Sequence, residues 1–381
     1  MKSFVFDTST RVIFGEGSVR ELAPAARELG FRRTLLVSDP GLVQSGHVET
    51  VSGILAEAGV QVHGFHDFGP DPESQMVDKG ASYARPLEVD SVVGLGGGSS
   101  MDCAKGINFL LTGGGTIHDY QGYGRVRGRM LPMIGIPTTT GTGSEAQSYA
   151  IIADARTHVK MACGDPQAAF RIAILDPCLT LSQPADVSSA TGFDALSHAV
   201  ESYCSKRSSA LSQSFSREAW WLLERNYERV LRDPTDLEAR GAMQLGAFYA
   251  GLAIENSSVG AAHACANPLS ARYRTPHGVA IGLLLSPVIR WTGTVAESAF
   301  GDLLHLSGGN SWKGRDASGS LAGRLDELAA LAGLPRELRS EGVLEGDLET
   351  LAAEASSHWT VEFNPRLLTS LGAMEIYREA W

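Results

Sequence analysis

The order of apolar and polar positions divides the chain into two parts with different patterns. In the first part, short apolar runs typical of buried strands alternate with amphipathic stretches typical of helices. The expected strands cover 34–38, 60–65, 91–94, 133–137 and 171–175, and two of the intervening helices cover 18–29 and 48–58. Alternation of this kind favours parallel strands joined by crossover helices.

After Pro177 the pattern becomes helical, and few β-branched runs remain. Helical patterns cover 183–204, 209–232, 236–256, 278–290, 319–332 and 344–355. A chain of 381 residues is long enough for two domains. We therefore expect an α/β domain over residues 1–180 and an all-α domain over residues 181–381, with the boundary in the proline-containing turns near residue 180.

Charge and cysteine usage narrow the range of partners and compartments. The formal net charge is -11 and no long basic run occurs, so neither nucleic acid nor an anionic membrane surface is an expected partner. The chain has five cysteines without a CxxC pair, which suits a reducing compartment. The N-terminus lacks the shape of a signal peptide, and no segment approaches 18 uninterrupted apolar residues. A soluble, cytoplasmic protein is expected.

A glycine-rich turn follows the strand expected at 91–94. Gly96, Gly97 and Gly98 allow a ligand to approach the backbone, and the helix that follows offers free N–H groups, which suits a pyrophosphate. The alternative is a tight turn from strand to helix in which Ser99 is the N-cap. A second polar run, 137–145, also follows a strand. Its hydroxyl groups are suited to phosphate or ribose, or to local hydrogen bonds.

One carboxylate and three histidines form a candidate metal site. Asp194 and His198 are four residues apart in a helical pattern with apolar neighbours, so they share one face of a buried helix. His263 and His277 must come from two further segments, because two prolines between them argue against one continuous helix. The set suits Fe(II) or Zn(II) acting as a Lewis acid. Taken singly, each of these residues is more often a capping Asp, a surface His or a hydrogen-bonded core His than a metal ligand.

Ordered motifs along the chain carry a resemblance to a known family. They are Phe14-Gly15-x-Gly17, Gly96-Gly97-Gly98-Ser99 with Asp102, Pro137-Thr138-Thr139 through Gly143-Ser144-Glu145, Gly192-x-Asp194-Ala195-Leu196-x-His198-Ala199-x-Glu201, His263 through Pro276-His277-Gly278, Asn364-Pro365-Arg366 and the terminal Ala380-Trp381. With these motifs the chain resembles the iron-containing, or group III, alcohol dehydrogenases over nearly its whole length. Within that family it resembles the lactaldehyde reductase and 1,3-propanediol dehydrogenase types.

The resemblance implies a dehydroquinate-synthase-like fold, with NAD bound by the α/β domain and a metal ion, Fe(II) or alternatively Zn(II), bound by the helical domain. The implied metal ligands are Asp194, His198, His263 and His277. The implied cofactor-binding residues are Asp39, Gly96, Gly97, Gly98, Ser99, Asp102, Thr138, Thr139, Thr142 and Lys160. The implied substrate-pocket residues are Gln147, Tyr149, Ile151, Ile254 and Thr360.

Two of these positions have specific consequences. Asp39 matches the acid that accepts hydrogen bonds from the adenosine ribose. A carboxylate there repels a 2′-phosphate, which favours NAD over NADP, although an aspartate before proline is also typical of a turn. Tyr149 combines bulk with a polar tip, which suits a small polar substrate, and packing at a domain interface is the alternative.

The chain departs from the family at one position of the metal-binding region. The family pattern is His-x-x-x-His-Pro, whereas this chain has Asn267 in place of the second histidine, which the family uses to relay the alcohol proton. Asparagine forms hydrogen bonds but takes up no proton at neutral pH. The four expected metal ligands are unaffected by this change. The family's proton relay, however, cannot be carried over to this chain. The sequence gives no reason to assign a role to His358.

The expected function is that of a metal-dependent, NAD-linked alcohol dehydrogenase or aldehyde reductase acting on a small primary alcohol or its aldehyde. The resemblance implies a homodimer or a larger homo-oligomer. Three alternatives stay open: a hydroxyacid–oxoacid transhydrogenase, a lyase or cyclase related to dehydroquinate synthase, and a non-catalytic protein that binds NAD and metal.

Overall fold

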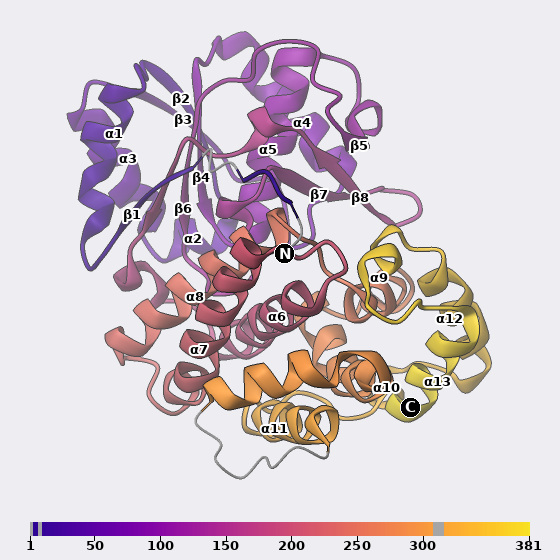
Figure 1. Cartoon of the computed structure of the whole chain (residues 1–381). Coiled ribbons are helices and arrows are strands. Elements are labelled where there is room, and N and C mark those ends of the chain that lie inside the picture. Colours follow the sequence, from indigo (N-terminus) through magenta and orange to yellow (C-terminus); the bar gives the residue numbers. More distant parts are fainter. Residues whose placement is uncertain (1–2, 7–9, 308–315) are drawn as a thin grey trace. The chain divides into compact units, whose positions relative to one another are not determined.

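The computed structural model describes residues 3–6, 10–307 and 316–381, and it contains two compact units (Figure 1). The first unit ends at Gln183. The second begins at Pro184 and also includes the described residues 3–6 at the N-terminus. The division falls between Gln183 and Pro184.

The first unit is built on a parallel sheet. Within its described residues, six strands lie in the order β1-β9-β6-β4-β2-β3, and every pairing in this sheet is parallel. The strands are β1 (Arg11–Phe14), β2 (Arg33–Val37), β3 (Gln61–Phe65), β4 (Ser91–Gly96), β6 (Met133–Pro137) and β9 (Ile172–Leu175). All five strands expected from the sequence are confirmed. The edge strand β1 was not expected, because four residues, two of them exposed and two half-buried, make a weak pattern.

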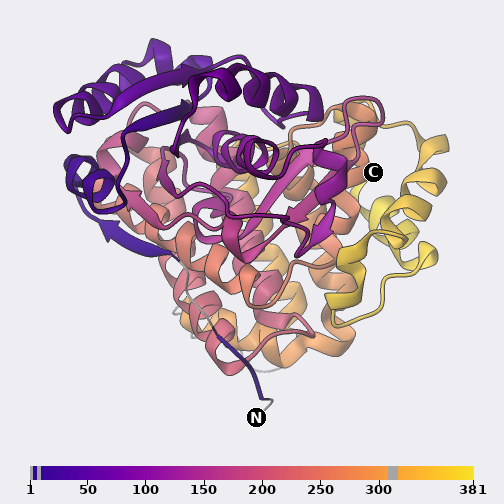
Figure 2. The same ribbon diagram turned by 90° about the horizontal axis from the view of Figure 1, so that it is seen from above.

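Helices cover both faces of this sheet (Figure 1 and Figure 2). They are α1 (Leu22–Glu28), α2 (Pro40–Gln44), α3 (His47–Glu57), α4 (Ser74–Ala84) and α5 (Gly98–Gly113). Successive strand residues point to opposite faces. Leu35 accordingly packs in the core under α4 and α5, whereas Leu36 packs in the core under α1 and α3. Burial on both faces explains why the strands are continuous apolar runs.

A smaller sheet in the first unit was missed by the sequence analysis. It joins β5 (Gly122–Tyr123), β8 (Lys160–Gly164) and β7 (Tyr149–Ala153), and β7 and β8 form an antiparallel hairpin. In both longer strands, half-buried and buried residues alternate over the first four positions. A pattern of that kind is a weaker signal than the apolar runs of the parallel sheet.

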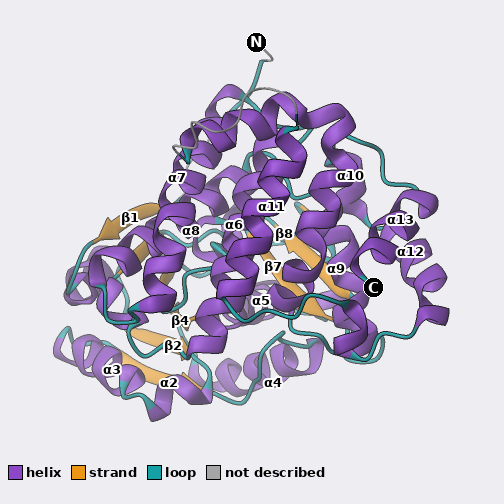
Figure 3. Cartoon of the chain, turned by 90° about the horizontal axis from the view of Figure 1, so that it is seen from below, coloured by secondary structure: helices purple, strands orange, loops and turns teal. Residues whose placement is uncertain are grey.

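The second unit is helical, and its described residues contain no strand (Figure 3). Its helices are α6 (Ala185–Cys204), α7 (Ala210–Arg232), α8 (Leu237–Glu255), α9 (Ala261–Tyr273), α10 (His277–Leu306), α11 (Ala317–Leu331), α12 (Leu348–Ser356) and α13 (Ser370–Ala380). The six expected helical segments are confirmed. Two helices, α9 and α13, were not expected, and α10 extends well beyond residue 290.

Prolines act differently in α9 and at its end. Pro268 lies inside α9, which continues for five further residues. The chain leaves the helix at Arg274, whose φ of 58° is left-handed, and Pro276 then precedes the first residue of α10. His263 and His277 therefore belong to separate helices, as expected. The break, however, is set by the 274–276 turn and not by Pro268.

The long helix α10 forms the centre of the helical core and packs against α6, α9 and α11. It is the one helix within the described residues with the length and composition to span a membrane. However, 72% of its apolar window is buried inside the protein, as is common for a core helix. Its first residue, His277, is thereby held beside the helices that carry the other candidate ligands.

Candidate metal and cofactor sites

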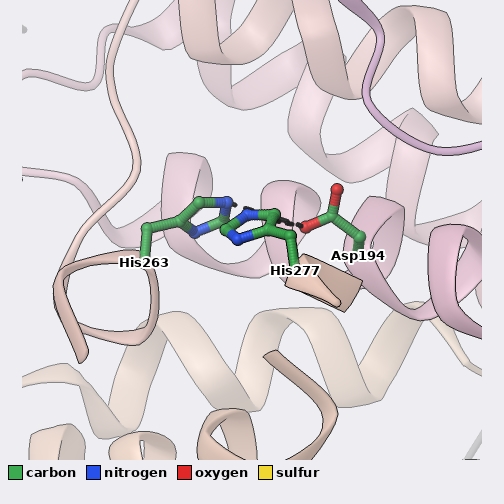
Figure 4. A group of neighbouring side chains, drawn as sticks. All are labelled: Asp194, His263 and His277. Carbon is green, nitrogen blue, oxygen red and sulfur yellow. Dashed lines mark ion pairs between the residues drawn. The ribbon is translucent and has the colours of Figure 1, made fainter. Parts of the chain in front are cut away.

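Three helices of the second unit bring the candidate metal ligands together. Asp194 and His198 lie one turn apart on α6, His263 lies in the first turn of α9, and His277 begins α10. Oδ1 of Asp194 lies 3.4, 3.7 and 3.8 Å from Nε2 of His198, His263 and His277, respectively. Figure 4 shows Asp194, His263 and His277 pointing toward one another. All four side chains expected from the sequence converge.

These distances fit one divalent ion. Bonds of about 2.1 Å to a tetrahedral ion separate the ligand atoms by about 3.4 Å. The observed separations bracket that value, since Nε2 of His198 also lies 3.0 Å from Nε2 of His263. Oδ1 of Asp194 is buried and accepts no hydrogen bond within the described residues. A buried carboxylate oxygen without a donor is costly unless a cation binds it, so the residues fit a metal ion.

Glu201 orients one of the candidate ligands, although the sequence analysis gave it no role. It follows His198 on α6 by three residues and is 96% buried at its side chain. Its two oxygens accept hydrogen bonds from the backbone N–H of Ala262, at 2.7 Å, and from Nδ1 of His263, at 2.5 Å. With its proton on Nδ1, His263 presents the Nε2 lone pair to the ligand cluster.

Asn267 follows His263 by one turn of α9. Its side-chain amide nitrogen lies 3.0 Å from Nε2 of His358, and Nδ1 of His358 lies 2.9 Å from the hydroxyl of Thr360. His358 and Thr360 lie at the start of η9 (Trp359–Phe363). An imidazole thus lies beside the side chain of Asn267, and no sequence signal distinguished His358 because the two positions are 91 residues apart.

The glycine-rich turn of the first unit forms a narrow backbone cradle. Gly96 has a φ of 139°, and Gly97 caps α5 without a side-chain bond. A Cβ on Gly97 would lie 3.0 Å from Thr139, and one on Gly98 would lie 2.6 Å from Thr142. Glycine is required here because the threonine loop packs directly against the turn. The alternative in which Ser99 is the N-cap is wrong, because α5 begins at Gly98.

Other predicted cofactor residues surround this turn. The backbone N–H of Thr138 donates to the carbonyl oxygen of Gly96 at 3.0 Å. The hydroxyl of Ser99 accepts from the backbone N–H of Asp71 at 3.2 Å, and the ammonium of Lys160 lies 2.9 Å from the carboxylate of Asp71. Thr138, Ser99 and Lys160 therefore gather near the N-terminus of α5, and their contact with a cofactor stays a prediction.

Asp39 lies at the carboxyl end of β2 and has two neighbours. Oδ1 accepts from the backbone N–H of Gly41 at 2.9 Å and caps α2, so the turn-forming role expected as the alternative is present. Oδ2 lies 3.5 Å from the hydroxyl of Ser100, in the first turns of α5. This carboxylate therefore stands beside the glycine-rich turn, where ribose hydroxyls would reach it if a dinucleotide lay there.

Asp102 belongs to a buried polar network instead of facing open space. Its carboxylate accepts a 2.6 Å hydrogen bond from the hydroxyl of Ser144 and lies 3.9 Å from the ammonium of Lys105. Lys105 also donates to the carbonyl oxygens of Ser144 and Tyr149. Burial raises the pKa of Asp102, and burial raises the pKa of the neighbouring Glu145 to about 7. The network ties α5 to the threonine loop.

The predicted substrate-pocket residues are divided between the two units. In the first unit, Gln147 donates to the carbonyl oxygen of Thr142 at 2.9 Å, and Tyr149 and Ile151 lie half-buried on β7. In the second, Ile254 is half-buried near the end of α8 and Thr360 is buried. Their contact with a substrate stays a prediction.

Comparisons with known proteins match both parts of the chain. Residues 9–177 match the family described as iron-containing alcohol dehydrogenase, and residues 188–381 match the C-terminal part of that family. An NAD-dependent methanol dehydrogenase from Bacillus methanolicus is 32% identical over 97% of each chain. A 1,3-propanediol dehydrogenase from Citrobacter freundii is 32% identical, with coverage of 97% of this chain and 96% of its own.

The solved structures agree with these matches. The crystal structure of a 1,3-propanediol oxidoreductase superposes over 100% of both chains with a TM-score of 0.96 at 31% identity. The predicted fold class and the predicted family resemblance are both confirmed by this match and by the family models.

Proposed function

This chain belongs to the iron-containing alcohol dehydrogenase family, and we propose that it interconverts a small primary alcohol and its aldehyde with NAD and a divalent metal ion. The observation that carries the proposal is the convergence of one carboxylate oxygen and three imidazole nitrogens, with separations of 3.0–3.8 Å for the pairs given above. The other unit of the same chain contains the glycine-rich cradle. The names of the two dehydrogenases that match over 97% of the chain support a small alcohol as substrate.

Each group of residues has a defined task in this proposal. Asp194, His198, His263 and His277 hold the metal ion, for which we propose Fe(II) in accordance with the family. When bound, the ion supplies a Lewis acid for an alcohol or carbonyl oxygen, and the nicotinamide accepts or supplies the hydride. Glu201 keeps the proton of His263 on Nδ1, so that Nε2 stays available to the ion.

The first unit binds the cofactor in this proposal. The backbone N–H groups of Gly97 and Gly98 face the pyrophosphate at the start of α5, where the helix dipole favours negative charge. Asp39 accepts hydrogen bonds from the adenosine ribose and disfavours a 2′-phosphate, which supports NAD over NADP. The free cysteines support a reducing compartment, and we propose a cytoplasmic homo-oligomer.

The test is a spectrophotometric NADH assay with a panel of short aldehydes and their alcohols. Metal-free protein, protein reconstituted with Fe(II) or Zn(II), and the His263→Ala variant are compared. We expect NADH oxidation that requires both the aldehyde and the metal, and that is lost in His263→Ala together with bound metal. Undiminished turnover in the metal-depleted variant contradicts the proposal. Turnover between a hydroxyacid and an oxoacid without release of NADH would indicate a transhydrogenase instead.

A further inference from the structure

A buried carboxyl group lies in the loop that packs against the glycine-rich turn. Glu145 belongs to η4 (Ser144–Ala146) and is 4% exposed. In the same loop, Thr142 packs against the turn, since a Cβ on Gly98 would lie 2.8 Å from its hydroxyl oxygen. Three residues of extended chain span at most about 11 Å. Glu145 therefore lies close to the proposed pyrophosphate site.

The surroundings of Glu145 do little to stabilise it as an anion. Within the described residues, its carboxylate accepts one hydrogen bond, from its own backbone N–H. Helix η4 packs mainly against α5 and β6, and β6 has no titratable residue. The charged groups that face Glu145 are Asp102 and Lys105 of α5, and Lys160 of β8 acts on Asp102. One ammonium group of α5 thus serves two carboxyl groups.

That ammonium group stabilises Asp102 more directly than Glu145. Lys105 is fully buried and donates to the carbonyl oxygen of Ser144 at 2.8 Å and to the hydroxyl of Ser144 at 2.9 Å. The hydroxyl of Ser144 in turn donates to Asp102 at 2.6 Å, and the backbone N–H of Ile151 also donates to this carboxylate. Among the described residues no comparable chain of donors reaches Glu145. Glu145 is therefore the carboxyl group of the pair that exchanges a proton.

We propose that Glu145 takes up a proton when the dinucleotide binds, so that the affinity for NADH falls as the pH rises. The negative phosphates repel a buried carboxylate close to them, whereas they do not repel the neutral acid. Binding therefore favours the protonated form, and the proton comes from the solvent. The inference rests on the proposed function, since it concerns the regulation of the same cofactor site by pH.

The pH range and the magnitude follow from burial and charge. Burial raises the pKa of Glu145 to about 7 in the free protein. Below that value the acid is already protonated and NADH binds without uptake; above it, the cofactor must bind beside a carboxylate or a proton must be taken up. Two phosphate charges about 10 Å away, screened as in bulk water, raise Kd for NADH by about threefold between pH 6 and pH 8.

The test measures binding of NADH to the full chain by fluorescence titration at pH 6, 7 and 8. Calorimetry at pH 7, in two buffers with different enthalpies of ionisation, measures proton uptake. Glu145→Gln retains the shape of the side chain without its charge, and Glu88→Gln, at an exposed glutamate of the same unit, is the matched control. His66→Gln removes an imidazole whose Nδ1 lies 2.9 Å from the carbonyl oxygen of Ser38, at the carboxyl end of β2.

We expect the wild type and Glu88→Gln to show the threefold rise in Kd and an uptake of about 0.3 proton at pH 7. Glu145→Gln shows a constant Kd and no uptake. ADP-ribose, which has the same phosphates without the nicotinamide, reproduces the pH dependence of NADH. Uptake that persists in Glu145→Gln overturns the inference, and its loss in His66→Gln would identify the imidazole as the source. A pH dependence that is absent with ADP-ribose also overturns it, because phosphate charge is then not the cause.

Two outcomes separate this inference from the proposed function. If the wild type binds NADH at none of the three pH values, the cofactor assignment of the proposed function fails together with the inference. If it binds NADH with the same Kd at every pH and without proton uptake, only the inference fails. These measurements on the wild type decide the matter even if Glu145→Gln does not fold.

Discussion

Replacing Glu201 by glutamine is expected to weaken metal binding selectively, because this carboxylate fixes the protonation of a ligand. In the native chain its two oxygens accept from the N–H of Ala262 at 2.7 Å and from Nδ1 of His263 at 2.5 Å. Glutamine has nearly the same volume but offers one acceptor and one NH2 group. Either the N–H of Ala262 or Nδ1–H of His263 then faces another donor.

The magnitude follows from how His263 can respond. The imidazole can move its proton from Nδ1 to Nε2 and accept from the new amide, but Nε2 must then lose that proton before it binds a metal ion. Loss of such a partner typically lowers metal affinity by about 10- to 100-fold. This corresponds to about 1.4–2.7 kcal/mol of binding free energy. The loss of a hydrogen bond to a charged group also costs about 1.5–3 kcal/mol of folding stability.

The assay is a chelator competition that measures Zn(II) affinity, paired with urea unfolding of the metal-free protein. Glu224→Gln is the matched control. Glu224 is a buried glutamate of the same unit that pairs with Arg324 at 2.8 Å and lies in no predicted site. Both variants should be less stable, and only Glu201→Gln should bind metal more weakly. Equal Zn(II) affinity in Glu201→Gln and the wild type would refute the reasoning.

Three further predictions concern the first unit. Gly98→Ala should lower NADH affinity by about tenfold or more by forcing Thr142 away from the turn, whereas Gly53→Ala, with open space around it, should leave NADH fluorescence titrations unchanged. Asp39→Ser keeps a cap for α2 but removes the charge, so the NADP-to-NAD ratio of kcat/KM should rise; a constant ratio contradicts the assigned role. Because the folded-state pKa of Glu145 is raised from 4.5 to about 7, the folded protein holds a proton that the unfolded chain releases. Stability should therefore fall, by up to about 3 kcal/mol, between those pH values. Glu145→Gln should remove this pH dependence in urea unfolding, and equal slopes for the two proteins would show that Glu145 is not its source.

Much of the architecture follows from local patterns. The buried runs of β2, β4 and β6 are apolar on both faces and short, which marks strands of a covered parallel sheet. The hairpin of β7 and β8 escaped prediction because its strands are short, each contains half-buried residues, and they depend on pairing with each other. Helix α9 was missed for another reason: Pro268 weighs against a helix locally, but the surrounding core holds it in place.

Some contacts of the candidate site could likewise be predicted from the sequence, and others could not. Asp194 and His198 can be paired from the sequence alone, because a spacing of four residues on one helix fixes their proximity. The bond between Glu201 and His263, and the bond between Asn267 and His358, join residues 62 and 91 positions apart. No periodicity encodes such a contact, since it exists only after separate helices have packed.

By itself, the sequence determined which residue types could bind a metal ion and a dinucleotide, and on which elements they lie, because composition and spacing act locally. Tertiary structure decided which side chains meet. Packing of α10 against α6 and α9 brings His277 to Asp194, and the return of the chain at η9 places an imidazole beside Asn267. Backbone spacing is a property of one segment, whereas a hydrogen bond between distant segments depends on the packing of the whole unit.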